Sequence, residues 1–486
     1  MVSKETSTDI LIIGTGAAGL SASIEASSRG ARVKIVEQAP AHGGTAIGSG
    51  GGVLMVDTPL QRKKGVEDSI ELACEDWRKW SKGTADMEWA RFYIERSLPE
   101  LYHWTAGLGV QWSVLMDQEG NSVPRWHRPE GGGEEIVRCL YQEAVKSEAV
   151  EWAFSTRVKK LLKDEGEGGA VRGAEVQRES GEEEIEAKAV IAATGGFCSN
   201  HDMIRKHSPR LKHLRFLAGG GPGAFGSGHG LIGDAGGSLQ HLEDIWMYAF
   251  ATPDPKDRDG KRGLAIRGLK NAIWVNFQGK RFHNEDLSGG ATGTPAVLSQ
   301  QPPMCWAIID SSMIGELVVS DPSYREWSET VSDMVMGLLE GSPDIKRAPS
   351  IEDLAKAMNV DRREFRKTMN GYNQYLEDGL TEDPAFGKDL RGMKKIERPP
   401  FYAIQFMPLA RKNFGGVRTG LTCRVLDPRG EAVPGLYAAG ELAGMAGGHI
   451  NGAAGLEGTM LGPSIFSGRV AGAWAAHHLG FGQGFQ

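Results

Sequence analysis

The sequence predicts an α/β fold in a chain that is long enough for two domains. Three observations predict it. The chain has 486 residues, and 40% of them are hydrophobic, which is enough to fill large cores. A strand, a glycine turn, a helix and a second strand follow one another in residues 9–37. Two further apolar strands, in residues 189–197 and 433–441, also end at glycine turns.

The first element is a short buried strand, Asp9–Ile13 (DILII), and the turn GTGAAG follows it at Gly14–Gly19. A helix to about Ser28 and a strand, Ala31–Val36, come next, and Glu37 ends that strand. The glycines allow a tight turn, close approach of a pyrophosphate and packing of helix on strand, and an acid in this place binds a ribose diol. We therefore expect a dinucleotide with its phosphates at the helix N-terminus, rather than a turn without a ligand.

Three more glycine clusters are spread along the chain. His42–Val53 (HGGTAIGSGGGV) comes soon after Glu37, and its bare backbone suits a large flat group such as a flavin ring. The other two end the strands in Ala189–Phe197 (AVIAATGGF) and Val433–Glu441 (VPGLYAAGE). We expect all four clusters to converge on one cofactor.

Composition excludes several other classes of protein. Glycine accounts for 67 of the 486 residues, about twice the average usage, without a collagen-like period. The formal net charge of -7 argues against a nucleic-acid binder. We expect no signal peptide and no membrane span, because no apolar run is long enough. The five cysteines form no CxxC pair, so we expect no metal, no disulfide framework and a cytoplasmic location.

Motifs outside the glycine clusters are similar to those of one flavoprotein superfamily. They are WHRPEGGGEEIV at Trp126–Val137, GLIGDAGGSL at Gly230–Leu239, WVNFQGKRFHNE at Trp274–Glu285 and FGGVRT at Phe414–Thr419. With the glycine clusters they resemble the fumarate reductase / succinate dehydrogenase flavoproteins, which include 3-ketosteroid dehydrogenases, over nearly the whole chain. The resemblance implies an FAD-binding Rossmann domain of the glutathione reductase type, interrupted by a fumarate-reductase-like capping domain of α+β structure.

The resemblance also implies where the domains meet. We expect the FAD-binding domain in residues 1–242 and 386–486, and the capping domain in residues 243–385. The capping segment includes a helical tract, Ser350–Gly379, in which apolar residues recur near helical spacing and Asp361 is a candidate N-cap.

The implied cofactor is non-covalent FAD, because Thr45 stands where some members of the superfamily attach flavin to a histidine. In this superfamily the last helix begins beneath the flavin, where backbone N–H groups stabilise the reduced ring. The small residues of His449–Gly468 (HINGAAGLEGTMLGPSIFSG) suit that role or, alternatively, a close helix packing interface. The residues expected to contact FAD are Gly14, Gly16, Ala17, Ala18, Gly19, Glu37, Gln38, Gly43, Gly44, Thr45, Ser49, Gly50, Gly51, Gly52, Val158, Ala193, Thr194, Gly195, Asp234, Gly440, Glu441, Thr459, Met460 and Leu461.

The residues that fumarate reductases use to bind their substrate are replaced here. Those enzymes bind a dicarboxylate with histidines and arginines, and an arginine delivers the proton. The matching positions in this chain are Tyr248, Gly289, Lys412 and Gly455. A site for two carboxylates cannot keep its affinity without paired cations, which disfavours fumarate as the substrate.

The 3-ketosteroid dehydrogenases give a better local match. Their motifs resemble GGVRT at Gly415–Thr419 and GPSIFSG at Gly462–Gly468. The resemblance implies removal of a proton next to a carbonyl and transfer of a hydride from the neighbouring carbon to flavin N5. The two tyrosines of that reaction are matched by Gly289 and Ala454, so the acid and base residues must differ here.

Two candidate catalytic residues occupy positions where relatives carry substrate-facing histidines. Tyr248 could donate to a carbonyl, or it could pack in an aromatic cluster with Trp246 and Phe250. Lys412 could stabilise negative charge on a reduced flavin or an enolate, or it could lie in an exposed loop.

Two more candidates, His449 and Asn451, lie in the loop before the last helix. Histidine is the side-chain type that titrates near neutral pH, which suits an acid or base. Glu457 follows them, and a role as the cap of the last helix is as reasonable for it as catalysis.

We therefore expect an FAD-dependent dehydrogenase or reductase that acts on a CH–CH bond, with desaturation of a 3-ketosteroid-like or other apolar cyclic ketone as the first hypothesis. The alternatives are a C=C reductase of an unsaturated carboxylate and a flavin-binding protein without turnover. The expected partners are a small-molecule substrate and an external electron acceptor or donor, since the chain has no haem-attachment motif.

Overall fold

The computed structural model describes residues 6–166, 168–321, 324 and 333–485, which fall into two compact units. The first unit comprises Met1–Pro209, Gly220–Trp246 and Lys412–Gln486, and the second comprises Arg210–Gly219 and Met247–Arg411. The expected boundaries lie after residues 242 and 385. The second of them falls inside the second unit, because the strand Phe401–Asn413 pairs there with other strands.

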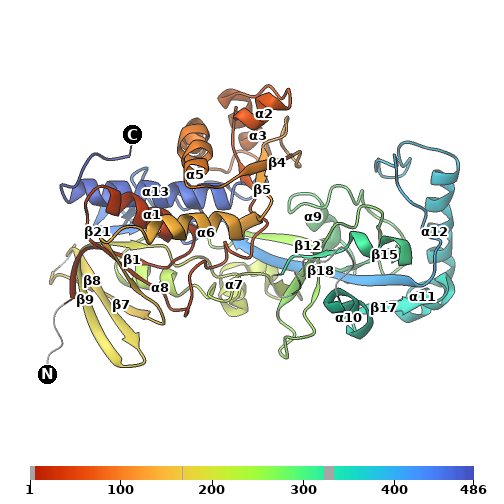
Figure 1. The fold of residues 1–486 in the computed structure, drawn as a ribbon. Helices are drawn as coiled ribbons and strands as arrows, with labels where there is room; N and C mark the ends of the chain where they lie inside the picture. Colours follow the sequence, from red (N-terminus) through yellow and green to blue (C-terminus); the bar gives the residue numbers. More distant parts are fainter. Residues whose placement is uncertain (1–5, 167, 322–323, 325–332, 486) are drawn as a thin grey trace. The chain divides into compact units, whose positions relative to one another are not determined.

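A mixed sheet is the framework of the first unit (Figure 1). Its strands lie in the order β20-β21-β9-β1-β2-β6, and β8 pairs with both β7 and β9. The pairs β21–β9, β9–β1, β1–β2 and β2–β6 are parallel, which confirms the predicted α/β class. The bounds are β1 Thr6–Ile13, β2 Val33–Val36, β6 Val150–Ala153, β7 Arg157–Lys163, β8 Val171–Arg178, β9 Gly181–Ala192, β20 Arg424–Leu426 and β21 Ala432–Ala438.

The carboxyl ends of the parallel strands line up at one edge of this sheet. Ile13 is in register with Val36 and with Ala192, and Ala192 is also paired with Ala438. The glycine turns that follow β1, β9 and β21 therefore lie side by side, together with the residue after β2. Ligands of open parallel sheets bind outside the carboxyl ends of the strands.

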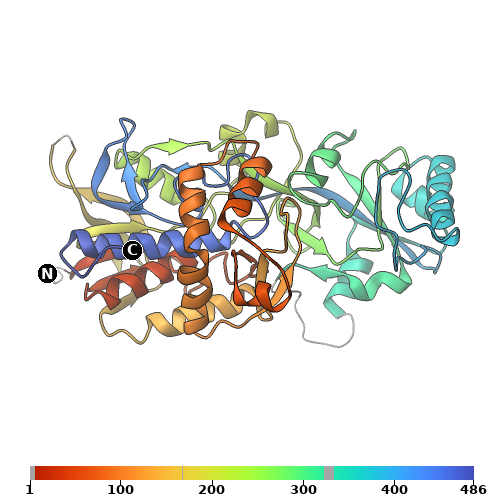
Figure 2. The ribbon, with the colours of Figure 1, turned by 90° about the horizontal axis from the view of Figure 1, so that it is seen from above.

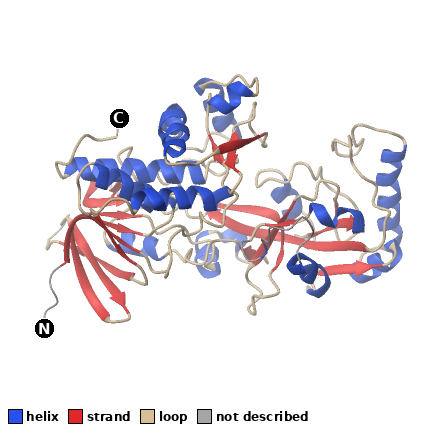
Figure 3. Ribbon diagram, in the orientation of Figure 1, coloured by secondary structure: helices blue, strands red, loops and turns tan. Residues whose placement is uncertain are grey.

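Three helices cover one face of the sheet: α1 (Ala17–Ser28), α6 (Gly132–Ala144) and α13 (Leu461–His478). Helix α1 contacts both of the others, and Figures 2 and 3 show α1 and α13 side by side. A Cβ atom on Gly468 would stand 2.2 Å from Ala18 O, and one on Gly472 would stand 2.3 Å from Ala22 O. Helix packing therefore requires small residues here, which confirms for Gly468 one of the two roles considered for the C-terminal glycine-rich segment.

The other face of the sheet buries a hydrophobic core. Leu11 and Ile13 of β1 enter this core, where they meet Ile232 of α8 (Ser227–Asp234). Ile12 between them lies on the α1 face, within 3.5 Å of where a Cβ on Gly19 would be. This alternation is what a strand buried on both faces requires.

The remaining elements of the first unit surround this layer. Strands β8 and β9 form an antiparallel hairpin through the turn at residues 179–180. A separate sheet has the order β3-β5-β4, and the short strands β11 and β19 pair with each other. The bounds are β3 Val53–Leu54, β4 Trp112–Met116, β5 Trp126–Pro129, β11 Leu239–Gln240, β19 Gly416–Val417, α2 Pro59–Lys63, α3 Ile70–Trp80, α4 Met87–Ser97, η1 Leu98–His103, α5 Trp104–Gly107, α7 His201–His207 and η2 Pro209–Leu211.

The second unit is built on its own sheet, in the order β14-β15-β18-β12-β13-β16, with β10 and β17 also paired to β18. The predicted helical tract at residues 350–379 forms two helices, and Asp361 caps the second one by accepting from Glu364 N (2.8 Å), as expected. The bounds are β10 Leu217–Ala218, β12 Ile245–Pro253, β13 Gly263–Arg267, β14 Ile273–Val275, β15 Cys305–Asp310, β16 Val318–Val319, β17 Ile345–Ala348, β18 Phe401–Asn413, α9 Gly293–Leu298, η3 Ser311–Glu316, α10 Asp333–Gly341, α11 Ile351–Met358 and α12 Arg362–Glu377. Among the helices in the described part of the chain, none is long and apolar enough to cross a membrane.

Candidate functional site

The GTGAAG turn after β1 forms the centre of the candidate site, and its three glycines have different parts. A Cβ on Gly14 would stand 2.5 Å from Ala193 O, and a Cβ on Gly19 would stand 1.9 Å from Gly14 O. Packing of the protein itself therefore requires these two glycines. A Cβ on Gly16 would meet nothing within 4 Å, although Gly16 is the N-cap of α1. Open space thus lies at the N-terminus of a helix that no described side chain caps, where a pyrophosphate is expected.

Glu37 connects the end of β2 to this turn. Its Oε2 accepts from Thr15 N (2.9 Å) and Thr15 Oγ1 (2.8 Å), and its Oε1 accepts from Ala39 N (2.9 Å). A carboxylate offers roughly four acceptor positions, so it can also accept from a ribose hydroxyl. The carboxylate therefore holds the glycine turn in place and keeps capacity for a nucleotide.

The second glycine cluster folds back on the first. Gly43 N donates to Thr15 O (3.1 Å), and a Cβ on Gly44 would stand 3.3 Å from Gly16 Cα. A Cβ on Gly50 would meet nothing within 4 Å. The expected convergence of the glycine clusters is therefore present in the first unit.

Two glycines of the second cluster are explained by packing inside the protein. A Cβ on Gly52 would stand 1.9 Å from Trp126 Nε1, so the flat group against this glycine is the Trp126 indole. A Cβ on Gly51 would stand 2.4 Å from the carbonyl carbon of Gly132. Their expected contact with FAD stays a prediction, because packing of the chain already demands glycine at both positions.

The turn after β9 and the turn after β21 complete the edge. Gly195 has φ +76° and faces open space, and Gly440 has φ +70°, with room for a Cβ limited by Ala18 at 2.8 Å. The Thr194 Oγ1 atom is buried and has no hydrogen-bond partner among the described residues. These turns present backbone atoms and a hydroxyl to the same edge of the sheet as Gly16.

Two of the expected FAD contacts, Val158 of β7 and Asp234 of α8, are connected to opposite ends of β7. Val158 is near the start of the strand, and the backbone N–H two residues before it donates to Glu37 O (2.8 Å). Asp234 is the exposed last residue of α8, and the carbonyl of the next residue accepts from Lys163 at the end of β7 (2.9 Å). The start of β7 is therefore bonded to Glu37 and its end to the residue after α8, and the FAD contacts of Val158 and Asp234 stay predictions.

The loop before α13 holds a buried amide. Asn451 is fully buried, its Nδ2 donates to Thr459 O (3.0 Å), and its Oδ1 has no hydrogen-bond partner among the described residues. Helix α13 begins at Leu461 with Met460 as its N-cap, and no side chain caps it. Glu457 lies three residues before Met460, and its role as a cap or in catalysis stays a prediction.

Lys412 lies near the end of β18 and forms an ion pair with the Glu441 carboxylate. Its Nζ lies 3.0 Å from Glu441 Oε2, and Asn413 N donates to Glu441 Oε1 (3.3 Å). Asn413 Oδ1 accepts in turn from Phe197 N (3.1 Å). The Lys412 side chain is 17% exposed. It is therefore part of a semi-buried ion pair next to the turn after β21, and does not lie in an exposed loop.

Tyr248 belongs to the second unit, apart from the other catalytic candidates. It is buried in β12 and stacks on Phe250, with ring centroids 4.8 Å apart. The Arg267 guanidinium carbon lies 5.5 Å from the centroid of its ring. Trp246, the third member of the expected aromatic cluster, belongs to the first unit and stacks on Phe414 at 5.1 Å.

Phe414, which stacks on Trp246, lies beside Gly455, the position that matches the substrate arginine of fumarate reductases. A Cβ on Gly455 would stand 2.9 Å from Phe414 Cζ and 3.0 Å from Asn451 Oδ1. A larger side chain could begin here only if these neighbours moved. An aromatic ring and a buried amide therefore border Gly455.

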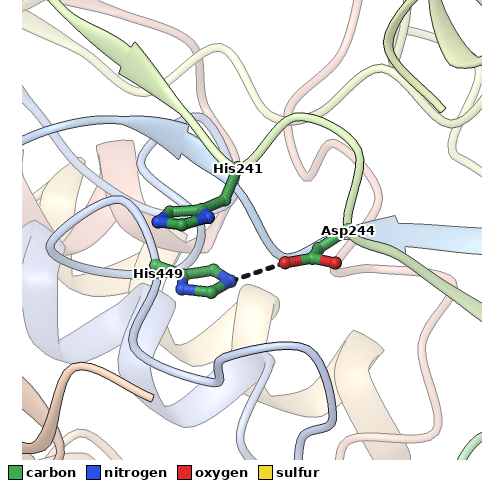
Figure 4. A group of neighbouring side chains, drawn as sticks. All are labelled: His241, Asp244 and His449. Carbon is green, nitrogen blue, oxygen red and sulfur yellow. Dashed lines mark hydrogen bonds and ion pairs between the residues drawn. The ribbon is translucent and has the colours of Figure 1, made fainter. Parts of the chain in front are cut away.

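His449 pairs with a residue that the sequence did not single out. His449 Nε2 lies 2.8 Å from Asp244 Oδ2, and the His449 ring stacks on His241 with centroids 3.8 Å apart and planes 10° apart (Figure 4). His449 is buried, Asp244 is half-buried and His241 is exposed. Asp244 and His449 are 205 positions apart, so no local spacing could have indicated the pair.

Two other histidines of the first unit are buried for structural reasons. His127 hydrogen-bonds Thr58 Oγ1 through Nε2 (2.7 Å) and Arg125 O through Nδ1 (2.8 Å), and burial lowers its pKa to about 4. Burial also lowers the pKa of His229 to about 4, and its ring meets Phe197 edge-on at 5.1 Å. Both side chains are therefore neutral at physiological pH.

The parallel sheet and the open N-terminus of α1 define a dinucleotide-binding α/β protein, and comparison with known proteins identifies its family. A family model described as FAD binding domain matches residues 9–461. A fumarate reductase (cytochrome) of Shewanella frigidimarina is 31% identical over 475 residues, which cover 97% of this chain and 77% of that protein. A KsdD-like steroid dehydrogenase of Mycobacterium tuberculosis (strain CDC 1551 / Oshkosh) is 29% identical over 550 residues, which cover 97% of this chain and 96% of that protein.

A solved structure gives the same result. The crystal structure of 3-ketosteroid-Δ4-(5α)-dehydrogenase from Rhodococcus jostii RHA1 with 4-androstene-3,17-dione covers 98% of both chains, with a TM-score of 0.73 and 27% identity. The chain belongs to the FAD binding domain family and is an FAD-dependent oxidoreductase. The predicted cofactor, the predicted fold and the resemblance to fumarate reductase and ketosteroid dehydrogenase flavoproteins are confirmed.

Proposed function

We propose that this enzyme acts on the CH–CH bond next to the carbonyl of an apolar cyclic ketone, with desaturation of a 3-ketosteroid-like compound as its reaction. The observation that carries the proposal is the position of Phe414 beside Gly455. Phe414, which stacks on Trp246, borders the position where fumarate reductases carry an arginine for the substrate carboxylate. Apolar aromatic faces suit a ring system and offer no partner to a carboxylate.

The pairing of Lys412 supports the same substrate class. An ammonium group 3.0 Å from the Glu441 carboxylate forms a pair with no net charge. A second carboxylate, brought by a substrate, would have to compete with Glu441 for the same cation. A neutral ketone avoids that competition.

Residues of this chain have separate roles in the proposed reaction. FAD, when bound, supplies the acceptor for the hydride. We assign His449 to accept the proton from the carbon next to the carbonyl. Tyr248 stays the sequence-based candidate for a hydrogen-bond donor to a carbonyl oxygen. Asn451 holds the loop between His449 and α13 through its bond to Thr459 O. A separate acceptor outside this chain removes the electrons, and the proposal keeps the cytoplasmic location expected from the sequence.

The decisive experiment follows the yellow flavin absorbance of the purified enzyme under anaerobic conditions. Saturated 3-ketosteroids and simpler cyclic ketones are added one at a time. Bleaching of the flavin by a saturated ketone, with appearance of the unsaturated ketone, is the expected result. No bleaching by any ketone would contradict the proposal.

The likeness to a fumarate reductase gives a second candidate, a C=C reductase of an unsaturated carboxylate. Flavin absorbance also distinguishes this reaction from ketone desaturation. The enzyme is reduced chemically and mixed with unsaturated acids, and saturable re-oxidation of the flavin by an acid, but not by an unsaturated ketone, would favour the carboxylate reductase. We expect an unsaturated ketone to re-oxidise the flavin more efficiently than an unsaturated acid does.

A further inference from the structure

A compact group of polar side chains in the first unit contains two residues with no assigned role. His241 and Asp244 lie beside His449, and Figure 4 shows the Asp244 carboxylate at the edge of the His449 ring while the His241 ring covers its face. One nitrogen of each imidazole and one carboxylate oxygen lie within 4.8 Å of one another.

The chain holds these residues together through rigid local structure. Strands β11 and β19 pair just before His241, and Gln240 Nε2 donates to Gly447 O (3.2 Å), two residues before His449. Asp244 N donates to His241 O (3.0 Å), and Phe414 N donates to Asp244 O (2.8 Å). The carboxylate is therefore presented by a closed turn, which limits its freedom to move.

The hydrogen bond decides which nitrogen of His449 carries a proton. An ionised carboxylate only accepts, so His449 Nε2 must be the protonated nitrogen facing Asp244 Oδ2 at 2.8 Å. In the neutral imidazole the lone pair then lies on Nδ1. Asp244 thus selects one tautomer, and stacking on His241 fixes the plane of the ring.

The backbone conformation at His241 supports a functional role for its side chain. Its φ is +54°, a conformation that glycine or asparagine adopts more readily than histidine. Residues held in this conformation concentrate at functional sites.

A metal ion is a weaker explanation of the same cluster. A metal is bound in the plane of each imidazole, about 2.0–2.1 Å from the nitrogen. The two rings are nearly parallel and their centroids are 3.8 Å apart, so one ion cannot lie in both planes. Binding would require one ring to leave the stack.

We propose that Asp244 and His241 are positioning residues that hold His449 as a base with its lone pair on Nδ1. This inference rests on the proposed desaturation. In that reaction His449 Nδ1 would accept the proton from the carbon next to the carbonyl, FAD, when bound, would supply the acceptor for the hydride, and an electron acceptor outside this chain would be needed for turnover. Asp244 also stabilises the imidazolium that forms, as a carboxylate behind a catalytic histidine does.

The test measures anaerobic flavin reduction by a saturated ketosteroid in a stopped-flow instrument, together with the substrate Kd from saturation. Asp244→Asn keeps the shape of the side chain but removes its charge, and we expect the limiting rate constant to fall by about 100-fold with an unchanged Kd. His241→Phe should keep the stack and the rate, whereas His241→Ala should lower the rate. Glu148→Gln is the control, because it removes a carboxylate charge from an exposed position of the first unit that does not contact His241, Asp244 or His449, and its rate should equal that of the wild type.

A second measurement is independent of turnover. Nitrogen-15 NMR of histidine-labelled, FAD-loaded protein reports the tautomer of each imidazole, and His449 should be protonated on Nε2 in the wild type and mixed in Asp244→Asn. A wild-type rate in Asp244→Asn, or an unchanged tautomer, would overturn the inference. If no ketone reduces the wild-type flavin, the proposed function fails instead, and the tautomer result still decides whether Asp244 positions His449.

Discussion

A single methyl group at Gly16 tests where the phosphates of the cofactor bind. A Cβ there meets no protein atom within 4 Å, so Gly16→Ala should leave the stability of the FAD-free protein unchanged. If the pyrophosphate lies on the N-terminus of α1, the methyl group collides with it, and the affinity for FAD should fall at least about tenfold, or roughly 1.4 kcal/mol. Titration of the FAD-free protein with FAD, followed by flavin fluorescence, measures this.

Two other glycines of the first unit provide the controls for Gly16→Ala. Gly230 also faces open space and lies within α8, so Gly230→Ala should leave the FAD affinity unchanged and should raise the stability by about 0.5–1 kcal/mol. Gly19→Ala places a Cβ 1.9 Å from Gly14 O and should prevent correct folding. Equal FAD affinity in Gly16→Ala and the wild type would show that the phosphates do not bind at this helix terminus.

At the residue scale, the sequence predicts what local backbone needs and misses what distant partners need. The order of Gly14, Gly16 and Glu37 indicated a nucleotide because the whole strand–turn–helix unit is contiguous. Gly52 was interpreted as facing a flavin, and its close neighbour is the Trp126 indole, a contact that only the tertiary fold creates. The pairing of His449 with Asp244 was invisible for the same reason.

At the element scale, the hairpin motif WVNFQGKRFHNE is fixed by buried charges in the second unit. Arg281 makes two hydrogen bonds of 2.8 Å to the Glu285 carboxylate and lies 2.6 Å from Asp383 Oδ2. Glu285 Oε1 also accepts from Trp274 N (3.0 Å), and Lys388 Nζ donates to Ala272 O (2.8 Å). The motif therefore has a structural explanation in joining the hairpin to residues 383–388.

Removal of the Arg281 charge should destabilise the second unit strongly. Arg281→Met leaves the buried Asp383 carboxylate without its cation and leaves Glu285 with Lys388 alone, at 3.6 Å, which should cost about 4 kcal/mol. Urea unfolding followed by circular dichroism measures the change. Arg391→Met removes the exposed partner of Asp389 and should leave the stability nearly unchanged. A similar loss in both variants would mean that the buried network is not a special source of stability.

Element boundaries were predictable where a local signal exists. Asp361 was recognised as an N-cap because its own side chain closes the first turn of α12. The start of α13 was placed too early. Gly458 has φ +96°, which interrupts helical geometry between Glu457 and Leu461, and no nearby capping side chain marks the true start. Glycine permits this conformation without revealing it in the sequence.

At the scale of the whole molecule, strand register determines which distant segments lie next to one another. Convergence of the glycine clusters was predicted from their number, and the aligned ends of β1, β2, β9 and β21 provide it. The grouping of residues 386–411 with the second unit depends on pairing of β18 with strands nearly a hundred residues earlier, as in the register of Cys305 with Phe406. Long-range pairing of this kind leaves no local pattern.

Two buried histidines should make the stability of the folded chain depend on pH below neutrality. Burial lowers the pKa of His127 and of His229 to about 4, whereas an unfolded histidine has an ordinary pKa near 6.5. Between these values the unfolded chain binds protons that the folded chain does not, so the free energy of unfolding falls as the pH falls. From pH 7 to pH 5 each histidine should remove about 2 kcal/mol of stability.

Urea unfolding of the FAD-free protein at pH 7 and pH 5, followed by tryptophan fluorescence, measures this loss. His229→Leu is the informative variant, because neither His229 ring nitrogen has a hydrogen-bond partner among the described residues and leucine leaves no polar atom unsatisfied. It should lose about 2 kcal/mol less than the wild type over the same interval. Replacement of the exposed His213 by leucine should leave the pH dependence unchanged. Equal pH dependence in His229→Leu and the wild type would mean that His229 is protonated in the folded protein, and its neutral, buried state would then be refuted.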